Sequence, residues 1–104
     1  MAILAIVACK GLTKAHYESL RKTVNWEGHP PMGLMFHAAG FDDSGSIRVA
    51  DVWDSKESME AFFKVRLLPA IRSMNCPEPA AEMFPLHNAN AMGSLDRFKL
   101  LAHA

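Results

Sequence analysis

The sequence is poor in the features that mark several large classes of protein. Only two of its 104 residues are cysteine; Cys9 and Cys76 lie in segments of different type, so neither a disulfide framework nor a paired-cysteine metal site is supported. Its 11 basic residues balance its 11 acidic ones, so no excess charge favours binding to nucleic acid or to an anionic membrane. No apolar run approaches the roughly 18 residues of a membrane span. We therefore expect a cytoplasmic protein.

Signature motifs of common enzyme classes are also missing. The sequence has no glycine-rich phosphate loop, no GxSxG and no HExxH, which disfavours nucleotide-dependent, hydrolase-elbow and zinc-protease chemistry. The apolar run at residues 2–8 lacks a basic start, so it is interpreted as a buried strand and not as an export signal. Half of the residues are hydrophobic, and a domain this small buries only about 60–65% of its surface. Part of the apolar surface should therefore face a partner.

What the sequence does contain is an alternation of strand and helix patterns. Thr13 and Ser55 are good N-caps for two helices, and Pro69 should break or kink the second helix at Leu68. The expected order is strand 2–9, helix 13–24, strands 33–41 and 46–53, a helix from 55, and strand 81–88. This is a β-α-β-β-α-β ferredoxin-like domain of α+β class, with an antiparallel sheet, over residues 1–90. Residues 91–104 are expected to be a C-terminal tail, in which Ser94 is the predicted cap of a short helix that either packs on the domain or on a partner chain or frays.

The second face of the sheet predicts a homodimer. In this topology both helices cover one face, and the other face alternates to polar if water covers it. Here strand 33–41 is apolar on both sides, with Leu34, Phe36 and Ala38 on one and Met35, Ala39 and Phe41 on the other. A second copy would cover that face and produce a dimeric α+β barrel. The barrel then either encloses a small apolar cavity or is filled by its own side chains.

The hairpin between strands 33–41 and 46–53 decides which polar side chains meet. With Asp43-Ser44-Gly45 as a three-residue loop and Gly45 in the left-handed position, Asp42 opposes Ser46. The same register pairs Met35 with Trp53, His37 with Asp51, and Ala39 with Val49. A two-residue loop would shift the register by one and separate His37 from Asp51.

A histidine facing an aspartate beside a tryptophan is the best candidate chemistry in the chain. Asp51 would hold one tautomer of His37 and raise its basicity, so that the other ring nitrogen takes a proton from a substrate. Alternatively, the two residues form a structural pair at the subunit interface. A metal on His37, Asp51 and His87 lacks any supporting ligand spacing, so no metal is predicted. The predicted substrate-binding residues are Met35, Phe36, Trp53, Trp26 and His87.

One part of the sequence resembles a known family. The segment GLMFHAAGFDDSGSIRVADVWDSKESMEAFFKVRLLPAI at residues 33–71 is similar to the antibiotic-biosynthesis-monooxygenase-like proteins of the dimeric α+β barrel superfamily. The most telling pieces are VADVWDS at 49–55 and RLLPAI at 66–71, and the likeness extends to FPLHN at 84–88.

The resemblance implies a ferredoxin-like homodimer, with a pocket between sheet and helices or within the barrel. It also implies an enzyme without metal or organic cofactor, in which a base deprotonates an electron-rich substrate and the carbanion meets dioxygen. His37 would be the base, Asp51 its orienting partner and Trp53 a wall or hydrogen-bond donor. The predicted function is a cofactor-independent monooxygenase-like enzyme acting on a small apolar or aromatic ligand in a barrel pocket. The alternative is a non-catalytic dimeric ligand-binding or structural protein.

Overall fold

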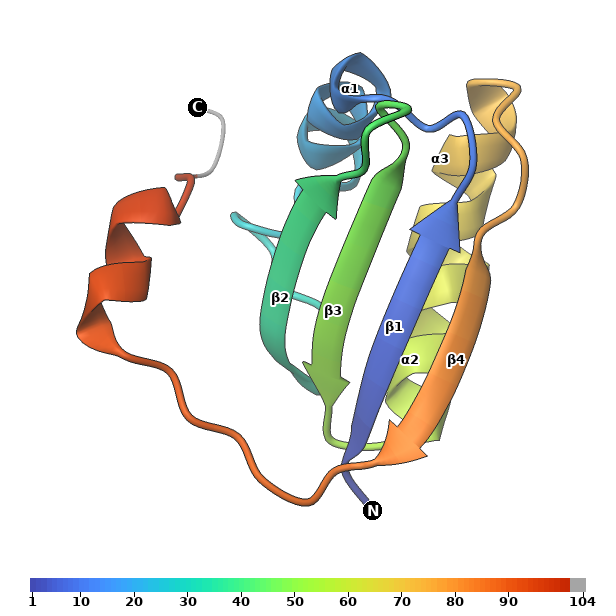
Figure 1. Ribbon diagram of the computed structural model, residues 1–104. Helices are drawn as coiled ribbons and strands as arrows, with labels where there is room; N and C mark the ends of the chain where they lie inside the picture. The colour runs from blue at the N-terminus through green and yellow to red at the C-terminus, as the bar shows by residue number, and fades with distance from the viewer. Residues whose placement is uncertain (102–104) are drawn as a thin grey trace.

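The computed structural model describes residues 1–101 and confirms the predicted α+β fold class and order of elements (Figure 1). Residues 102–104, the end of the predicted tail, lie outside the described residues. One antiparallel sheet, in the order β2-β3-β1-β4, consists of β1 (Ile3–Cys9), β2 (Leu34–Phe41), β3 (Ile47–Trp53) and β4 (Ala80–Pro85). The helices are α1 (Lys14–Val24), α2 (Lys56–Phe62), the π-helical turn η1 (Phe63–Leu67) and α3 (Leu68–Ser73). All of them cover one face of the sheet.

The first helix begins and ends as its sequence predicts. The Thr13 hydroxyl accepts a hydrogen bond from the His16 backbone N–H, which satisfies a free donor of the first turn. Asn25 ends the helix in the left-handed conformation, with φ 58°. Leu20 and Val24, four residues apart on one face, are buried against the sheet.

Pro69 does not break the second helical segment, which was one of the two effects predicted for it; a local irregularity precedes it instead. The backbone stays helical through Ser73 because a π turn precedes the proline, where Leu68 N–H donates to the Phe63 carbonyl. This wider turn moves carbonyls away from the place where the proline ring would collide with them. α2, η1 and α3 therefore form one helical column with a local irregularity.

The hairpin between β2 and β3 has the predicted three-residue loop. Asp42 N–H donates to the Ser46 carbonyl at 2.9 Å, and Gly45 has φ +82°. One Asp42 carboxylate oxygen accepts hydrogen bonds from the hydroxyl and backbone N–H of Ser44 and from Ser46 N–H. These hydrogen bonds, that of the Ser44 hydroxyl first, lower the pKa of Asp42.

The register that follows confirms His37 opposite Asp51 and Ala39 opposite Val49. The predicted pairing of Met35 with Trp53 is wrong, because a β-bulge at Met35 places Leu34 opposite Trp53.

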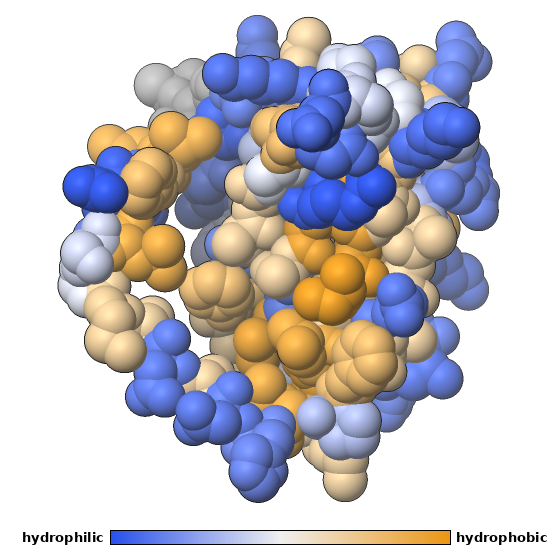
Figure 2. Space-filling view, in the orientation of Figure 1, coloured by the Kyte–Doolittle hydropathy of each residue, from blue (hydrophilic) through white to orange (hydrophobic). Residues whose placement is uncertain are grey.

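The two faces of the sheet are covered differently. The helix-covered face carries the core, which includes Ala5 and Trp53, each with no exposed surface. The opposite face, called the outer face below, is uncovered within residues 1–101 and shows an apolar area in Figure 2. Strand alternation assigns to it Leu4, Ile6, Ala8, Phe36, Ala38, Gly40, Ala50, Val52 and Phe84, with the charged Arg48 and Glu82.

The chain beyond β4 forms an arm that stands beside the domain (Figure 1). The strand ends at Pro85, so the predicted strand 81–88 is too long at its end. A 3-10 helix, η2 (Gly93–Phe98), replaces the predicted capped helix, and Ser94 makes no capping hydrogen bond there. Leu95 and Phe98 on this helix are 43% and 67% exposed. Within residues 1–101, no helix has the length and apolar character needed to cross a membrane.

Candidate active site

His37 and Asp51 form a hydrogen-bonded pair on the helix-covered face of the sheet. His37 Nδ1 lies 2.7 Å from Asp51 Oδ1, and the two side chains are 24% and 7% exposed. The pair comes from neighbouring strands at directly opposed positions, so the hairpin register alone sets the distance between them. It therefore lies between sheet and helices, and not on the outer face that a dimeric barrel would enclose.

Trp53 holds the second oxygen of the same carboxylate. Its Nε1–H donates to Asp51 Oδ2 at 3.2 Å, and its ring packs on Phe62 with the centroids 5.5 Å apart. Asp51 and Trp53 are two residues apart on β3, so both side chains point to the same face. Each carboxylate oxygen of Asp51 thus has one donor, as a buried carboxylate requires.

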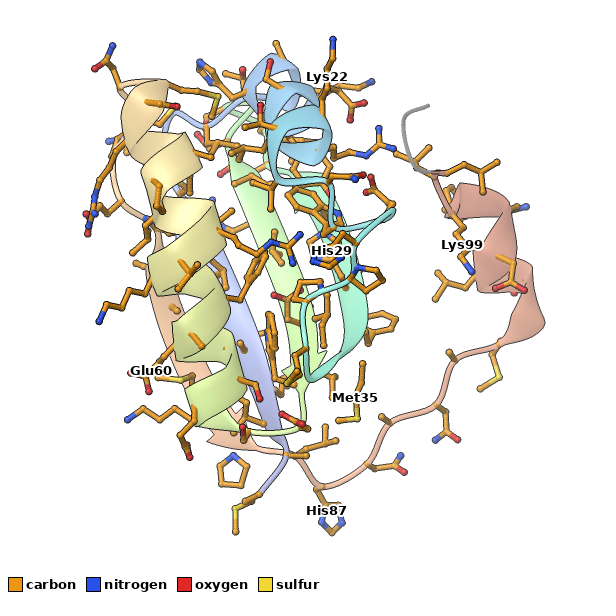
Figure 3. The ribbon with its side chains drawn as sticks, turned by 180° about the vertical axis from the view of Figure 1, so that it is seen from behind. Lys22, His29, Met35, Glu60, His87 and Lys99 are labelled. Carbon is orange, nitrogen blue, oxygen red and sulfur yellow. The ribbon has the colours of Figure 1, made fainter. Side chains whose placement is uncertain are left out.

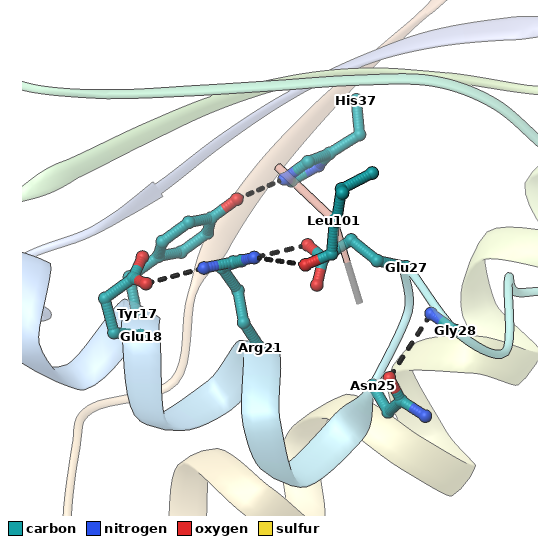
Figure 4. Close-up of polar contacts among 8 residues, drawn as sticks. All are labelled: Tyr17, Glu18, Arg21, Asn25, Glu27, Gly28, His37 and Leu101. Carbon is teal, nitrogen blue, oxygen red and sulfur yellow. Dashed lines mark hydrogen bonds and ion pairs between the residues drawn. The ribbon is translucent and has the colours of Figure 1, made fainter. Parts of the chain in front are cut away.

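The second ring nitrogen of His37 is hydrogen-bonded to Tyr17, which was not among the site residues predicted from the sequence. Tyr17 Oη lies 2.7 Å from His37 Nε2 (Figure 4), and the two rings are nearly parallel, with centroids 6.1 Å apart. Burial, above all, raises the pKa of the Tyr17 phenol, and the nearby Glu27 carboxylate adds to the shift. Tyr17 comes from α1, so the site joins helix to sheet.

These contacts make one chain of hydrogen bonds from Tyr17 through His37 and Asp51 to Trp53. An ionised carboxylate only accepts, so His37 Nδ1 carries the proton that it shares with Asp51. In the neutral imidazole Nε2 is then an acceptor, and the Tyr17 hydroxyl donates to it. The arrangement gives His37 a fixed tautomer with its basic nitrogen turned toward α1.

An apolar cavity of about 70 Å³ lies over this chain, between the sheet and the helices. Tyr17, His37, Asp51 and Trp53 all contribute to its wall. The apolar part of the wall comes mainly from the core, including Val7, Leu12, Leu20, Leu34, Val49, Phe62 and Phe63. The hydrogen-bonded residues therefore border a small cavity whose wall is otherwise largely apolar.

The structure brings Trp53 and Trp26 to this cavity but not the other predicted binding residues. The Trp26 ring lies 5.5 Å from both the Tyr17 and His37 rings, between centroids. Met35 is 56% exposed at the bulge, and Phe36 opposes Val52 on the outer face. His87 is exposed beyond β4, at the end of the molecule away from α1 (Figure 3).

The loop at residues 25–33, which carries Trp26 over the cavity, is held by two arginines. Arg66 from η1 donates to the carbonyls of Val24 and His29, both at 2.8 Å. Arg21, only 5% exposed, donates to Glu27 at 3.0 Å and to Glu18 at 2.6 Å. Arg21 also reaches the Leu101 carbonyl of the arm at 3.2 Å (Figure 4). Residues of α1, η1 and the arm therefore hold this loop in place over the cavity.

No cluster of metal-binding side chains occurs within residues 1–101. No three histidine, cysteine, aspartate or glutamate residues approach one another closely enough to hold an ion. In particular, His87 does not approach His37 and Asp51.

The fold of this chain is similar to that of several solved structures. No family model and no curated protein sequence matches the chain. A candidate antibiotic biosynthesis monooxygenase from Deinococcus radiodurans is 18% identical, with a TM-score of 0.58 over 89% of this chain and all of that one.

Two further structures agree. SnoaB from Streptomyces nogalater, a cofactor-independent oxygenase, is 14% identical, with a TM-score of 0.56 over 85% of this chain and 93% of its own. A dimeric ferredoxin-like protein of unknown function from Thermobifida fusca is 16% identical, with a TM-score of 0.57 over 83% and 92%.

The fold is that of the antibiotic-biosynthesis-monooxygenase-like proteins. The matches span nearly the whole of each structure, so the fold similarity covers the complete ferredoxin-like unit of this chain and not one motif. Identities of 13–18% carry the arrangement of strands and helices but not the identity of site residues. The similarity therefore shows the fold alone and assigns no role to Tyr17, His37 or Asp51.

Proposed function

We propose that this chain is a cofactor-independent monooxygenase-like enzyme acting on a small apolar or aromatic ligand, with His37 as base. The observation that carries the proposal is the His37–Asp51 pair at the wall of an apolar cavity, with the second Asp51 oxygen held by Trp53. Such a carboxylate fixes the imidazole tautomer and stabilises the imidazolium that forms when the base takes a proton. The similarity in fold to SnoaB, a cofactor-independent oxygenase, supports the same class of reaction.

The proposed reaction begins with proton removal from an electron-rich substrate carbon or its enol. The resulting anion transfers electrons to dioxygen directly. One oxygen atom becomes a carbonyl oxygen on the substrate carbon. The other leaves as water with two hydrogens of the substrate, one from that carbon and one from the phenol or enol O–H, so no external reductant is required. The apolar wall favours this step because a dry site strengthens the electrostatic pairing of imidazolium and Asp51.

Ligand entry requires movement of the loop at residues 25–33. The cavity of about 70 Å³ is smaller than the roughly 150 Å³ space known to admit benzene. Trp26 is the large side chain that this loop carries to the cavity, and hydrogen bonds and ion pairs from Arg21 and Arg66 hold the loop in place. An aromatic ligand would enter as the loop moves outward and would lie between the Trp26 ring and the Tyr17–His37 pair.

The second candidate is a non-catalytic dimeric binding or structural protein. Two observations favour it: the cavity is small, and Tyr17 already occupies the basic nitrogen of His37. In that case the hydrogen-bonded chain fastens α1 to the sheet, and its loss lowers stability without affecting any reaction.

Oxygen uptake in the presence of a panel of electron-rich phenols and hydroquinones tests the proposal. We expect wild-type protein to consume oxygen with at least one compound and to form the corresponding carbonyl product. His37→Ala should lower the rate by about 100-fold or more, the range of general-base catalysis. His87→Ala, which changes an exposed histidine away from the cavity wall and from the loop, is the matched control and should retain the wild-type rate. Absence of uptake, together with a lower melting temperature for His37→Ala, would favour the structural alternative.

A further inference from the structure

Tyr17 stands between the proposed base and any ligand. Its hydroxyl lies 2.7 Å from His37 Nε2, and His37 Nδ1 is committed to Asp51. Neither nitrogen of His37 is therefore free to meet a substrate. If His37 acts as base, the proton must reach it through the Tyr17 oxygen or Tyr17 must leave.

The surroundings of Tyr17 favour a fixed position. Its ring is packed by Trp26 at 5.5 Å, His37 at 6.1 Å and Phe41 at 6.0 Å, between centroids. It belongs to α1, whose start is capped by Thr13 and which is anchored through Leu20. Swinging the phenol away would break these contacts, whereas passing a proton through it needs no movement of heavy atoms.

The phenol is suited to relay a proton and not to hold a negative charge. Burial raises its pKa, so a free tyrosinate is disfavoured. While its O–H donates to His37 Nε2, the Tyr17 oxygen keeps lone pairs that accept a hydrogen bond from a ligand. The residue offers an acceptor to the cavity and a donor to His37 at the same time.

A second buried polar group, on a residue that lines the cavity, lacks a hydrogen-bond partner among residues 1–101. Trp26 Nε1–H is buried and, among residues 1–101, has no hydrogen-bond acceptor. A buried donor without an acceptor is costly, and a bound ligand that supplies an oxygen removes that cost. Tyr17 and Trp26 both line the cavity and their rings are in contact.

We propose that Tyr17 is the catalytic residue that touches the substrate, and that the substrate is a neutral phenol or enol bearing a second oxygen that accepts from Trp26. This inference rests on the proposed function of His37 as base. The ligand O–H donates to the Tyr17 oxygen, and its second oxygen receives Trp26 Nε1–H. A neutral ligand fits the apolar wall, which an anion would enter at a large desolvation cost.

The proton transfer balances within these groups. The ligand O–H bond breaks and its proton joins the Tyr17 oxygen. In the same step the original Tyr17 proton moves to His37 Nε2. The products are a ligand oxyanion, a neutral tyrosine and an imidazolium paired with the Asp51 carboxylate. The oxyanion of a phenol or enol shares its charge with carbon and is therefore the electron-rich species that dioxygen would attack.

Binding of 4-nitrophenol tests this step without any oxygen chemistry. The compound carries one phenol O–H and a nitro group with acceptor oxygens, and its phenolate is yellow. We expect wild-type protein to bind it, and we expect the apparent pKa of the bound compound to be lower on wild type than on Tyr17→Phe, because after the transfer the Tyr17 hydroxyl donates to the phenolate oxygen. Tyr17→Phe should bind it but reduce the bound phenolate fraction at least tenfold. Ser19→Ala, an exposed change on the same helix, should behave as wild type.

The proposed hydrogen bond from Trp26 to the ligand is tested with a separate variant and a second phenol. Trp26→Phe keeps an aromatic wall and removes only the N–H donor. We expect it to weaken 4-nitrophenol binding about five- to tenfold, the effect of one hydrogen bond. Affinity for 4-methylphenol, which has no second acceptor, should stay within about twofold of wild type.

The outcomes separate the relay from the oxygenase proposal. If Tyr17→Phe ionises bound 4-nitrophenol as effectively as wild type does, His37 acts alone and the proposed relay through Tyr17 is wrong. Failure of wild-type protein to bind either phenol in calorimetric titration would overturn the ligand class. If Tyr17-dependent ionisation is present and electron-rich phenols still cause no oxygen uptake, the relay stands and the monooxygenase proposal fails.

Discussion

At the residue scale, the two oxygens of Asp51 determine the direction of the whole hydrogen-bond chain. Each oxygen accepts one bond, from His37 Nδ1–H and from Trp53 Nε1–H. Asn has one oxygen and one NH₂ group, so Asp51→Asn serves both neighbours only if its NH₂ donates to His37 Nδ1. His37 would then carry its proton on Nε2 and donate to Tyr17. The substitution therefore reverses the direction of these hydrogen bonds, and His37 Nε2 no longer accepts a proton.

We therefore expect Asp51→Asn to remain folded, with a stability loss of about 1–2 kcal/mol, and to lose activity. The measurement is the ¹⁵N chemical shifts of His37, which distinguish a proton on Nδ1 from one on Nε2. An unchanged tautomer would contradict the donor assignment on which the chain is built.

Tyr17 also predicts how stability depends on pH. Burial holds the folded-state pKa of Tyr17 above the unfolded value of about 10. A raised pKa means that the folded protein keeps a proton that the unfolded chain releases, so this contribution is complete below about pH 10 and is lost as pH rises further. The free energy of unfolding should fall more steeply above pH 10 for wild type than for Tyr17→Phe.

Urea unfolding between pH 8 and about pH 11 measures this difference, because the other alkaline groups are common to both proteins. Tyr17 is the one tyrosine in the chain, so its own ionisation is also visible by ultraviolet absorbance. If the free energy of unfolding has the same pH dependence in both proteins, or if the Tyr17 phenol ionises at the ordinary tyrosine pKa, Tyr17 is not buried as described.

The sequence allowed His37 and Asp51 to be paired because one turn fixes their register. Asp42, Ser44 and Gly45 specify the loop, and strand alternation then determines the rest. Tyr17 could not be placed in the same way, since its bond to His37 depends on how α1 crosses the sheet. The available signal was a polar-tipped aromatic residue on the apolar side of that helix. Met35 was misplaced because a bulge leaves no clear mark in a single sequence.

At the scale of elements, the loop between α1 and β2 ends at a glycine that no other residue can replace easily. Gly33 has φ +87°, and a Cβ at this position would collide with the side chains of Asp54 and Ser58. Its carbonyl also accepts from Asp54 N–H at 2.8 Å. We expect Gly33→Ala to lower the free energy of unfolding by about 1–3 kcal/mol and to loosen the loop over the cavity.

Gly93→Ala provides the matched control for this substitution. Gly93 lies in the exposed arm, does not have a positive φ, and a Cβ there meets nothing within 4 Å. Its effect should stay within about 0.5 kcal/mol. Urea titration of both variants measures the two values, and equal effects would show that the left-handed geometry of Gly33 is not required.

The helical elements show where local rules stop being sufficient. The N-caps at Thr13 and Ser55 were predicted because capping depends on neighbours in sequence. Pro69 was expected to interrupt its helix, but packing of Ala70 and Ile71 into the core holds the segment in helical form through the π turn. His87 was assigned to β4 on apolar pattern alone, and β4 ends where its pairing with β1 ends, at Pro85 opposite Ile3.

At the scale of the whole molecule, the outer face has the character of an interface. Small residues on β2 and β3, among them Ala38, Gly40 and Ala50, leave an open depression of about 520 Å³. Ile6 lines this depression from β1, and Phe84 is exposed on β4. In a symmetric pair, the larger side chains of one copy would enter the depression of the other.

A charge at the centre of the outer face tests this homodimer. Ile6 is 37% exposed and lies between Ala50 and Glu82 on the neighbouring strands. In a dimer, Ile6→Glu would bury a second carboxylate directly beside Glu82 and should raise the dissociation constant about 100-fold or more, equivalent to roughly 3 kcal/mol. Val65→Glu, which changes a 71% exposed residue on η1, should leave the dimer intact.

Sedimentation velocity at micromolar concentration distinguishes the three proteins. Wild type and Val65→Glu should sediment as dimers, and Ile6→Glu as a folded monomer with the wild-type circular dichroism spectrum. Because the His37 site lies on the opposite face of the sheet, the monomeric variant should keep the Tyr17–His37 hydrogen bond. A wild-type protein that is monomeric and stable at that concentration would show that water covers the outer face, and the barrel would have to be abandoned while the site remained.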